Sequence, residues 1–248
     1  VDRGGHWASA ATAIVHPGVV TETKDAECTA NFLYTDALHN VYLGQAAHCS
    51  GTGSETDTNG CTSKSLPLGT DVKIVGTNIV GKMVYNSWLL MQQRGEKDEN
   101  ACAYNDLALI KLPASALAQA NPSIPVFGGP TGLNTTGTVA GDGVVSYGNS
   151  PLRQGISELS PKTGASLGDD GDGWTHTIYT LTPGVPGDSG SAVLDSQGRA
   201  LGDLSTLALL PTPLSNQVSD LAHELAYARA NSGLKDLRVV AGTEAFHS

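Results

Sequence analysis

The feature that most limits the possible fold is a succession of short β-type runs separated by turn residues. Val, Ile, Tyr, Leu and Thr dominate these runs, and Gly, Asn, Asp or Pro separate them. This pattern is typical of strands joined by turns and favours an all-β fold. The clearest runs are ATAIV (11–15), NVYLG (40–44), VKIVGTNIV (72–80), LALIKL (107–112), VVSYG (144–148) and HTIYTLT (176–182).

The order of these runs predicts two β units and one helix. The segment 112–130 is rich in Pro, Ala and Gly and poor in charge, as expected of a surface connection between units. We therefore place a domain boundary near residue 120, with units 1–120 and 121–248. A helix over about 216–231 is predicted from apolar residues at helical spacing, namely Val218, Leu221, Ala222 and Leu225.

Charge and hydropathy exclude two classes of partner. The formal net charge is −10, with 14 basic and 24 acidic residues, and no basic run is interleaved with aromatic residues. Such a chain would repel a phosphate backbone, so we expect no nucleic-acid partner. No apolar run approaches the roughly 18 residues that span a bilayer, so we expect no membrane insertion. The first residues lack the pattern of a signal peptide, which predicts a mature form.

The four cysteines indicate the compartment. Cys28, Cys49, Cys61 and Cys102 all lie in the first half of the chain, and none forms a C-x-x-C pair. That spacing gives no support to a zinc or thioredoxin-like site. An even number of cysteines in a glycine-rich, charge-poor chain favours two disulfides and a secreted, extracellular protein. The spacing alone leaves three pairings open, and buried free thiols remain the alternative.

Three short segments carry residues suited to nucleophilic catalysis. Ser189 stands in PGVPGDSGSAV (183–193), a run too rich in glycine and proline for a regular helix or strand. A serine hydroxyl needs a base, and the base works best when an anionic group orients its imidazole. GQAAHCSG (44–51) offers His48, and YNDLALIKL (104–112) offers Asp106 at the start of an apolar strand.

The other polar candidates have simpler interpretations. His6, His16, His39, His223 and His247 are most simply surface or structural residues, and His176 is more simply a packed strand residue than a part of the site. GDDGDG (168–173) holds three aspartates among glycines, but it lacks the terminal glutamate of a calcium loop. We interpret it as a solvated turn, and we expect no metal and no cofactor.

The three segments together resemble the chymotrypsin-like serine proteases. AAHC (46–49), NDLALIKL (105–112) and GDSGSAV (187–193) match the three catalytic signatures of that family, in its order His, Asp, Ser. The resemblance runs from about residue 11 to 230 and is greatest to secreted actinobacterial members. It implies two six-stranded antiparallel β-barrels with the active site in the cleft between them, followed by a C-terminal helix.

Residue by residue, the resemblance also implies the site. Ser189 would be the nucleophile, His48 the general base and Asp106 its orienting acid, while the N–H groups of Gly187 and Ser189 would form the oxyanion hole. Gly187 would let the backbone approach the oxyanion closely. The implied disulfides are Cys28–Cys49 and Cys61–Cys102.

The match departs from the animal enzymes at the N-terminus and at the specificity pocket. Val1-Asp2-Arg3 precedes the two glycines that usually follow a single aliphatic residue, so N-terminal activation is in doubt. Bacterial relatives pair the acid before the serine with an internal arginine, which implies an Asp188–Arg153 pair. No disulfide flanks the serine, since no cysteine follows Cys102.

The residues that the resemblance places around the substrate carry no charge. Pro183 would lie at the pocket base, where trypsin-type enzymes carry an aspartate, and it can donate no backbone hydrogen bond. Ser205, which would support Asp106, and Thr206 and Leu207 would form one wall. A leucine there would narrow the pocket, so we expect an uncharged, small or medium side chain on the acyl side of the scissile bond.

These features predict a secreted serine endopeptidase that acts through an acyl-enzyme on polypeptide substrates. We expect a monomer that a proteinaceous inhibitor could bind. The alternative is a catalytically inactive, protease-like binding module, because the same fold can serve without catalysis. The chain keeps all three triad residues and the oxyanion glycine, which favours the enzyme.

Overall fold

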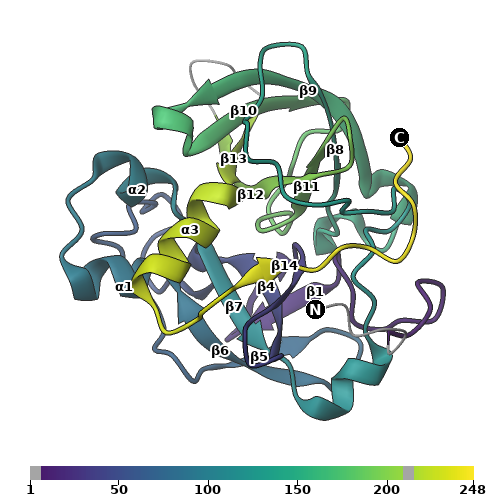
Figure 1. The fold of residues 1–248 in the computed structure, drawn as a ribbon, viewed down its shortest axis with the longest axis horizontal. Helices are drawn as coiled ribbons and strands as arrows, with labels where there is room; N and C mark the ends of the chain where they lie inside the picture. The colour runs from purple at the N-terminus through teal and green to yellow at the C-terminus, as the bar shows by residue number, and fades with distance from the viewer. Residues whose placement is uncertain (1–6, 209–214) are drawn as a thin grey trace.

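The computed structural model describes residues 7–208 and 215–248, and it consists mainly of antiparallel β-strands in two units (Figure 1). The first unit is an eight-stranded sheet, and the second is a closed six-stranded barrel. In Figure 1 the helix α3 (Leu221–Asn231) lies alongside both units, between the barrel and the sheet. No helix in the described part of the chain is long and apolar enough to cross a bilayer.

The first sheet has the strand order β14-β3-β4-β7-β6-β5-β1-β2. Seven of its strands precede residue 112, but the edge strand β14 comes from the end of the chain and pairs with β3. The strands are β1 (Val20–Thr23), β2 (Ala26–Thr29), β3 (Leu33–Thr35), β4 (Val41–Ala46), β5 (Asp71–Ile74), β6 (Val80–Asn86), β7 (Leu107–Lys111) and β14 (Arg238–Val239).

The second unit closes in the order β10-β13-β12-β11-β8-β9. Closure of the sheet removes its free edges. Its strands are β8 (Gly143–Tyr147), β9 (Pro161–Asp170), β10 (Thr175–Thr180), β11 (Ala192–Asp195), β12 (Ala200–Ala208) and β13 (Ser215–Asp220). The all-β fold with two units and a C-terminal helix is therefore confirmed. The second unit is the expected six-stranded barrel, whereas the first is an eight-stranded sheet and not a six-stranded barrel, because β14 and β2 extend its edges. The domain boundary near residue 120 stays a prediction.

The remaining elements are short helices. The α-helices are α1 (Ser87–Arg94), α2 (Glu99–Tyr104) and α3, and the 3-10 turns are η1 (Ala47–Ser50), η2 (Ala114–Gln119), η3 (Pro151–Arg153), η4 (Ser157–Leu159) and η5 (Gly171–Gly173). The start predicted for the last helix is wrong: residues 215–220 form β13, and α3 begins at Leu221. Asp220 caps it by accepting the N–H of His223, and pairing with β10 and β12 holds the preceding residues extended.

The run 11–15 also differs from the prediction, because it forms turns with a single bridge from Val15 to Ala120. The run 72–80 contributes to two strands, β5 and β6, joined by a tight turn at Gly76 with φ +79°. The other four runs lie largely within β4, β7, β8 and β10.

A shared apolar core joins the two units. Phe32, Tyr34 and Leu107 from the first unit pack in one cluster with Leu194 from the barrel and Leu225 from α3. These side chains are at most 1% exposed. Burial of large apolar side chains supplies most of the stabilising free energy at such an interface. The packing fixes the first sheet against the barrel.

Candidate active site

Strand pairing brings His48 and Asp106 together although 58 residues separate them. Ala46 at the end of β4 is the register partner of Leu107 at the start of β7, so the residues beside these strand ends become neighbours. The Asp106 carboxylate accepts two bonds from His48, at 2.9 Å from the backbone N–H and at 2.7 Å from ring Nδ1. Because a carboxylate only accepts, Nδ1 carries the proton and Nε2 is left free to act as a base.

The electrostatics of this pair favour the imidazolium. Burial by itself would lower the pKa of His48, but the charge and the hydrogen bond of Asp106 outweigh it, and the charge of Asp203 adds to them. The pKa of His48 is therefore raised above its ordinary value. The ring remains a quarter exposed, so a substrate can reach it.

Asp106 is held from two further directions. The hydroxyl of Ser205 on β12 donates to Asp106 Oδ2 at 3.1 Å, which is the supporting contact that the resemblance implies. The backbone N–H of Asp106 donates to Glu224 Oε1 on α3 at 2.9 Å. Sequence reasoning missed Glu224, because an acid within a helical pattern gives no signal that it faces inward.

Ser189 lies in the loop between β10 and β11 and is half-buried. Its backbone oxygen accepts the N–H of Thr29 at 2.9 Å, and the next residue, Gly190, donates to Leu204 O at 2.7 Å. Leu204 immediately precedes Ser205, whose hydroxyl reaches Asp106. These contacts anchor the serine loop beside the His48–Asp106 pair. The Ser189 hydroxyl has no hydrogen-bond partner among the described residues.

The backbone before Ser189 is shaped around a glycine. Gly187 adopts φ +97°, and a Cβ there would lie 2.9 Å from Ser150 Oγ, so a side chain at this position would be strained and crowded. Within the described part of the chain, the N–H groups of Gly187 and Ser189 have no acceptor. Two unpaired backbone donors near a serine can stabilise an oxyanion.

Asp188 is fully buried beneath this loop. The Arg153 guanidinium places one nitrogen on each carboxylate oxygen, and Lys162 Nζ lies 3.3 Å from Oδ2. Burial alone would raise the pKa of Asp188, but the Arg153 bonds and the Lys162 charge hold it below its ordinary value. The resemblance implied Arg153, whereas Lys162, on β9, was not predicted. Burial lowers the pKa of Lys162 despite the charge of Asp188.

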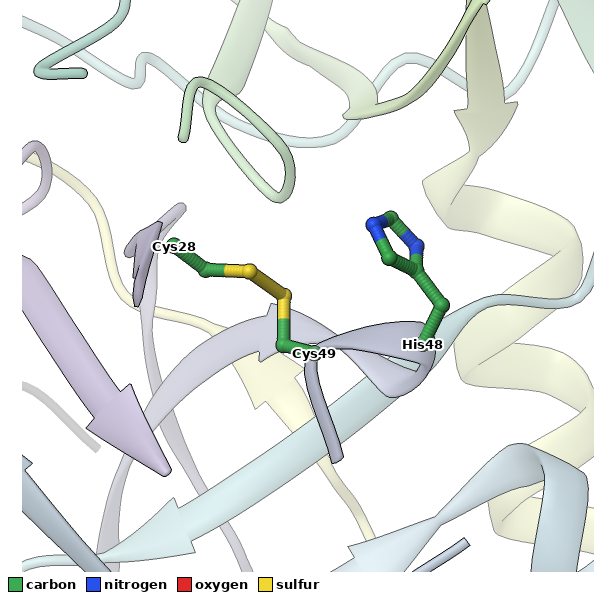
Figure 2. A group of neighbouring side chains, drawn as sticks. All are labelled: Cys28, His48 and Cys49. Atoms are coloured by element: carbon green, nitrogen blue, oxygen red, sulfur yellow. A yellow bond between two sulfur atoms is a disulfide. The ribbon is translucent and has the colours of Figure 1, made fainter. Parts of the chain in front are cut away.

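The disulfides are those that the resemblance implies, Cys28–Cys49 and Cys61–Cys102. The first lies next to the imidazole of His48 (Figure 2). A ring nitrogen and the two sulfur atoms are within 4.8 Å of one another, and no other group of three potential metal ligands occurs among the described residues. Because the sulfur atoms are bonded to each other, they offer no thiolate to a metal.

The structure describes only part of the predicted substrate wall. Pro183 is half-buried, and its carbonyl oxygen accepts from Lys162 Nζ at 3.5 Å. Thr206 and Leu207 belong to β12, but their side chains lie outside the described residues, as do Val1, Asp2 and Arg3. The narrowing role expected of Leu207 stays a prediction.

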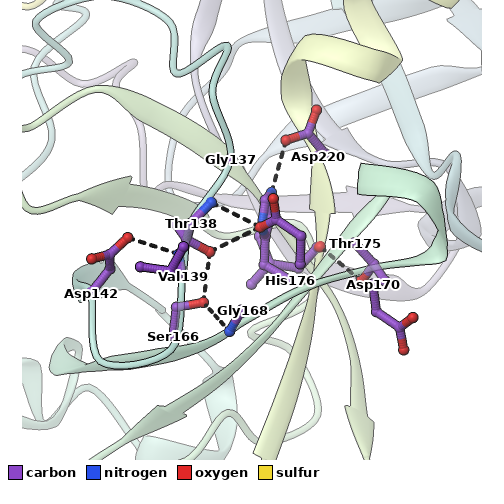
Figure 3. Close-up of polar contacts among 12 residues, drawn as sticks. Gly137, Thr138, Val139, Asp142, Ser166, Gly168, Asp170, Thr175, His176 and Asp220 are labelled. Atoms are coloured by element: carbon purple, nitrogen blue, oxygen red, sulfur yellow. Dashed lines mark hydrogen bonds and ion pairs between the residues drawn. The ribbon is translucent and has the colours of Figure 1, made fainter.

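His176 belongs to a separate network inside the barrel (Figure 3). Its fully buried ring bonds Asp169 at 2.5 Å through Nδ1 and Asp220 at 2.8 Å through Nε2. Burial alone would lower the pKa of His176, but the two aspartates raise it. The ring thus ties β9, β10 and β13 together. In 168–173, the strand β9 ends at Asp170 and the turn η5 follows.

Comparison with known proteins adds a fold relationship. No protein-family model matches the sequence, and no curated protein matches it. Thermobifida fusca protease A superposes with a TM-score of 0.57 at 14% identity, over 93% of this chain and 100% of that chain. Nocardiopsis protease gives 0.53 at 16%, over 91% and 98%. A serine protease described as specific for glutamic acid gives 0.54 at 17%, over 91% and 100%. At these identities the likeness establishes the chymotrypsin-like fold.

Proposed function

We propose that this chain is a serine endopeptidase that hydrolyses peptide bonds through an acyl-enzyme. The observation that carries the proposal is the 2.7 Å bond between His48 Nδ1 and Asp106 Oδ2, with the serine loop anchored beside it. This bond fixes the tautomer in which Nε2 can take a proton from Ser189. The protease fold, shared over most of the chain with solved serine proteases, also supports it.

The roles follow from the chemistry of each group. Ser189 Oγ attacks the scissile carbonyl carbon while His48 Nε2 accepts its proton, and Asp106 stabilises the imidazolium. The former carbonyl oxygen becomes negative and accepts from the N–H groups of Gly187 and Ser189. One well-placed donor of this kind contributes about 3–4 kcal/mol to transition-state stabilisation. The imidazolium then protonates the leaving amine, and water attacks the acyl-enzyme through the same base.

For the substrate we propose a polypeptide with an uncharged, small or medium side chain on the acyl side. Pro183 supports this, because it brings no charged side chain to the expected pocket base. A difference in side-chain fit discriminates by about 10- to 200-fold, so the preference is not absolute. A cleavage profile of a mixed peptide library tests it. Dominance of Lys, Arg or Glu at that subsite would contradict it, and one fold neighbour is described as glutamate-specific.

We also propose that the protein acts outside the cell as a monomer, and that a proteinaceous inhibitor can occupy the cleft. The two disulfides support an oxidising compartment, since such bonds are rare in the cytosol. Light scattering in solution tests whether the protein is a monomer. Inhibition by a reversible protein inhibitor of serine proteases tests whether such an inhibitor can occupy the cleft.

Active-site labelling tests the central proposal. An organophosphonate should form a covalent adduct on Ser189, located by peptide mapping, and both Ser189→Ala and His48→Ala should abolish it. Ser191→Ala is a matched control in the same loop, because the Ser191 hydroxyl already donates to Asp188 O. If correctly folded protein gives no adduct, an inactive protease-like binding module becomes the better explanation.

A further inference from the structure

Two carboxyl groups lie buried against the His48–Asp106 pair without any cation of their own. Asp203 on β12 and Glu224 on α3 are both 0% exposed. Neither forms an ion pair with a described lysine, arginine or histidine. A buried, unpaired carboxylate is strongly destabilising, so this arrangement needs a physical explanation.

The hydrogen bonds account for only one of the four oxygens. Glu224 Oε1 accepts the Asp106 N–H at 2.9 Å. Glu224 Oε2 and both Asp203 oxygens have no donor in the described part of the protein. The two carboxyl groups act on each other across the contact between α3 and β12. Ionised carboxylates only accept, so a bond between them requires a proton on one of them.

Among the described titratable groups that act on this pair of acids, only His48 can supply a compensating charge, and only when its ring is protonated. The charge of Asp106 raises the pKa of both Asp203 and Glu224 and so opposes their ionisation. Burial, followed by the charges of Asp203 and Glu224, raises the pKa of Tyr34 on β3 well above its ordinary value. Burial, followed by the charge of Glu224 and the interaction with Tyr227, does the same for Tyr85 on β6, so both tyrosines stay neutral. Tyr34 donates its hydroxyl hydrogen to Asn31 Oδ1 at 2.9 Å instead of to an acid.

We propose that Asp203 and Glu224 share one proton and act as a pair of positioning residues for the catalytic acid. The shared proton lies between the Asp203 carboxyl and Glu224 Oε2, and Glu224 Oε1 holds the backbone of Asp106. The pair carries one negative charge in total, and that charge acts on His48 in addition to the charge of Asp106. This inference rests on the proposed role of the His48–Asp106 pair.

The protonation behaviour of the two acids agrees with this geometry. Burial raises the pKa of Asp203 to about 8, and the neighbouring charge of Asp106 adds to the effect. Burial and the charge of Asp203 raise the pKa of Glu224 well above its ordinary value. Two interacting acids of this kind release their protons as a pair, the first readily and the second only at higher pH.

Variants that replace one or both acids by amides test the shared proton, because they set the total charge of the Asp203–Glu224 pair. In Asp203→Asn the amide replaces the protonated acid and Glu224 stays ionised, so the total charge remains −1. In Glu224→Gln the amide donates to an ionised Asp203, again with −1. Only in the double variant do positions 203 and 224 together carry no charge. The pKa of His48, followed by NMR, should therefore stay within a few tenths of a unit in either single variant and fall by roughly 1 unit in the double variant.

Each alternative protonation state gives a different result. If both acids were ionised, each single variant would already lower the His48 pKa. If both were protonated, the double variant would leave it unchanged. Either result overturns the proposal. Asp36→Asn is a matched control, since Asp36 is a buried aspartate that accepts from Tyr42 and does not act on His48. Because NMR reads His48 directly, the result stands even if the protein proves inactive.

A second measurement covers variants that fail to fold. The infrared spectrum of the wild-type protein near neutral pH should contain a carboxylic-acid carbonyl band that disappears as the pH rises. Absence of that band also overturns the proposal. For positioning, Glu224→Ala should lower kcat about tenfold with little change in KM, because the Asp106 N–H loses its acceptor. Glu224→Gln keeps that acceptor and should restore most of kcat, whereas equal losses in both variants would contradict the positioning role.

Discussion

The carboxylate of Asp188 receives both terminal nitrogens of the Arg153 guanidinium, one on each oxygen, directly beneath the loop that carries Ser189. The same carboxylate accepts the backbone N–H groups of Ser150 at 3.1 Å and Val185 at 3.0 Å. Five donors, including Lys162, thus converge on one buried acid. The pair connects the turn η3 to the serine loop, so the position of the loop depends on a residue more than thirty positions away.

Arg153→Ala should destabilise the protein by about 3 kcal/mol, because removing one partner leaves a buried carboxylate with incomplete compensation. Lys162 remains within 3.3 Å and keeps the loss at the lower end of the expected range. Urea unfolding measures the change. The control is Lys82→Ala, which removes a pair whose side chains are 61% and 60% exposed and should change stability by at most about 1 kcal/mol. Equal effects in the two variants would contradict a structural role for Arg153.

His176 should make stability depend on pH in the neutral to alkaline range. Its folded-state pKa is raised above the ordinary value, because Asp220 and Asp169 outweigh the burial of the ring. A raised pKa means that its stabilising contribution is complete below the unfolded-state pKa of about 6.5 and is lost as the pH rises through the folded-state value. The slope contributed is at most about 1.4 kcal/mol per pH unit.

Denaturant unfolding at several pH values measures that slope, and His176→Gln should remove it. His247→Gln is the matched control, because His247 is exposed and the hydrogen bond that the structure gives its ring is one to the backbone oxygen of Ala245 at 3.3 Å. An unchanged slope in the His176 variant would show that the ring stays neutral in the barrel.

The candidate catalytic residues can be predicted from the sequence more completely than the residues that surround and support them. His48, Asp106 and Ser189 each stand in a short segment whose composition is unusual, and the pairing of β4 with β7 then brings the first two together. Arg153 was found because the resemblance implied an internal partner for Asp188. The second partner, Lys162, was not predicted, because a lysine in a β-type segment more often points to solvent.

The missed features depend on long-range packing. Asp203 and Glu224 become a pair only because α3 lies against β12, and nothing in either local sequence encodes that contact. The start of the last helix was placed too early because Val218 is compatible with two patterns. It fits the two-residue repeat of a strand as an inward residue, and it fits the 3.6-residue repeat of a helix as the first apolar residue. Pairing with β10 and β12 decided in favour of the strand.

The two disulfides should differ in their effect on catalysis although both stabilise the fold. Replacing Cys28 and Cys49 by serine, or Cys61 and Cys102 by serine, should lower the free energy of unfolding by about 2–4 kcal/mol in each case. Only the first pair lies beside the His48 ring, so only its loss should also lower kcat. Steady-state kinetics below the melting range of both variants provide the comparison. Equal kcat values would show that the neighbouring disulfide does not hold the imidazole.

Peptidase activity should rise with pH around a midpoint above the ordinary histidine value of about 6.5. Only neutral His48 can accept the serine proton, and the Asp106 carboxylate, supported by the charge of Asp203, favours the protonated ring despite its burial. The pH profile of kcat/KM for the free enzyme measures this midpoint. A midpoint well below 6.5 would mean that burial outweighs the carboxylates.

The same assay tests the three proposed catalytic residues. Ser189→Ala, His48→Ala and Asp106→Asn should each lower kcat by several orders of magnitude, since the Asn side chain no longer fixes the required tautomer. The effects should not add in the double and triple variants, because the residues act as one unit. Circular dichroism and urea unfolding confirm that each variant is folded. Near-native turnover in a folded single variant would remove that residue from the mechanism and leave its hydrogen bond with a structural role only.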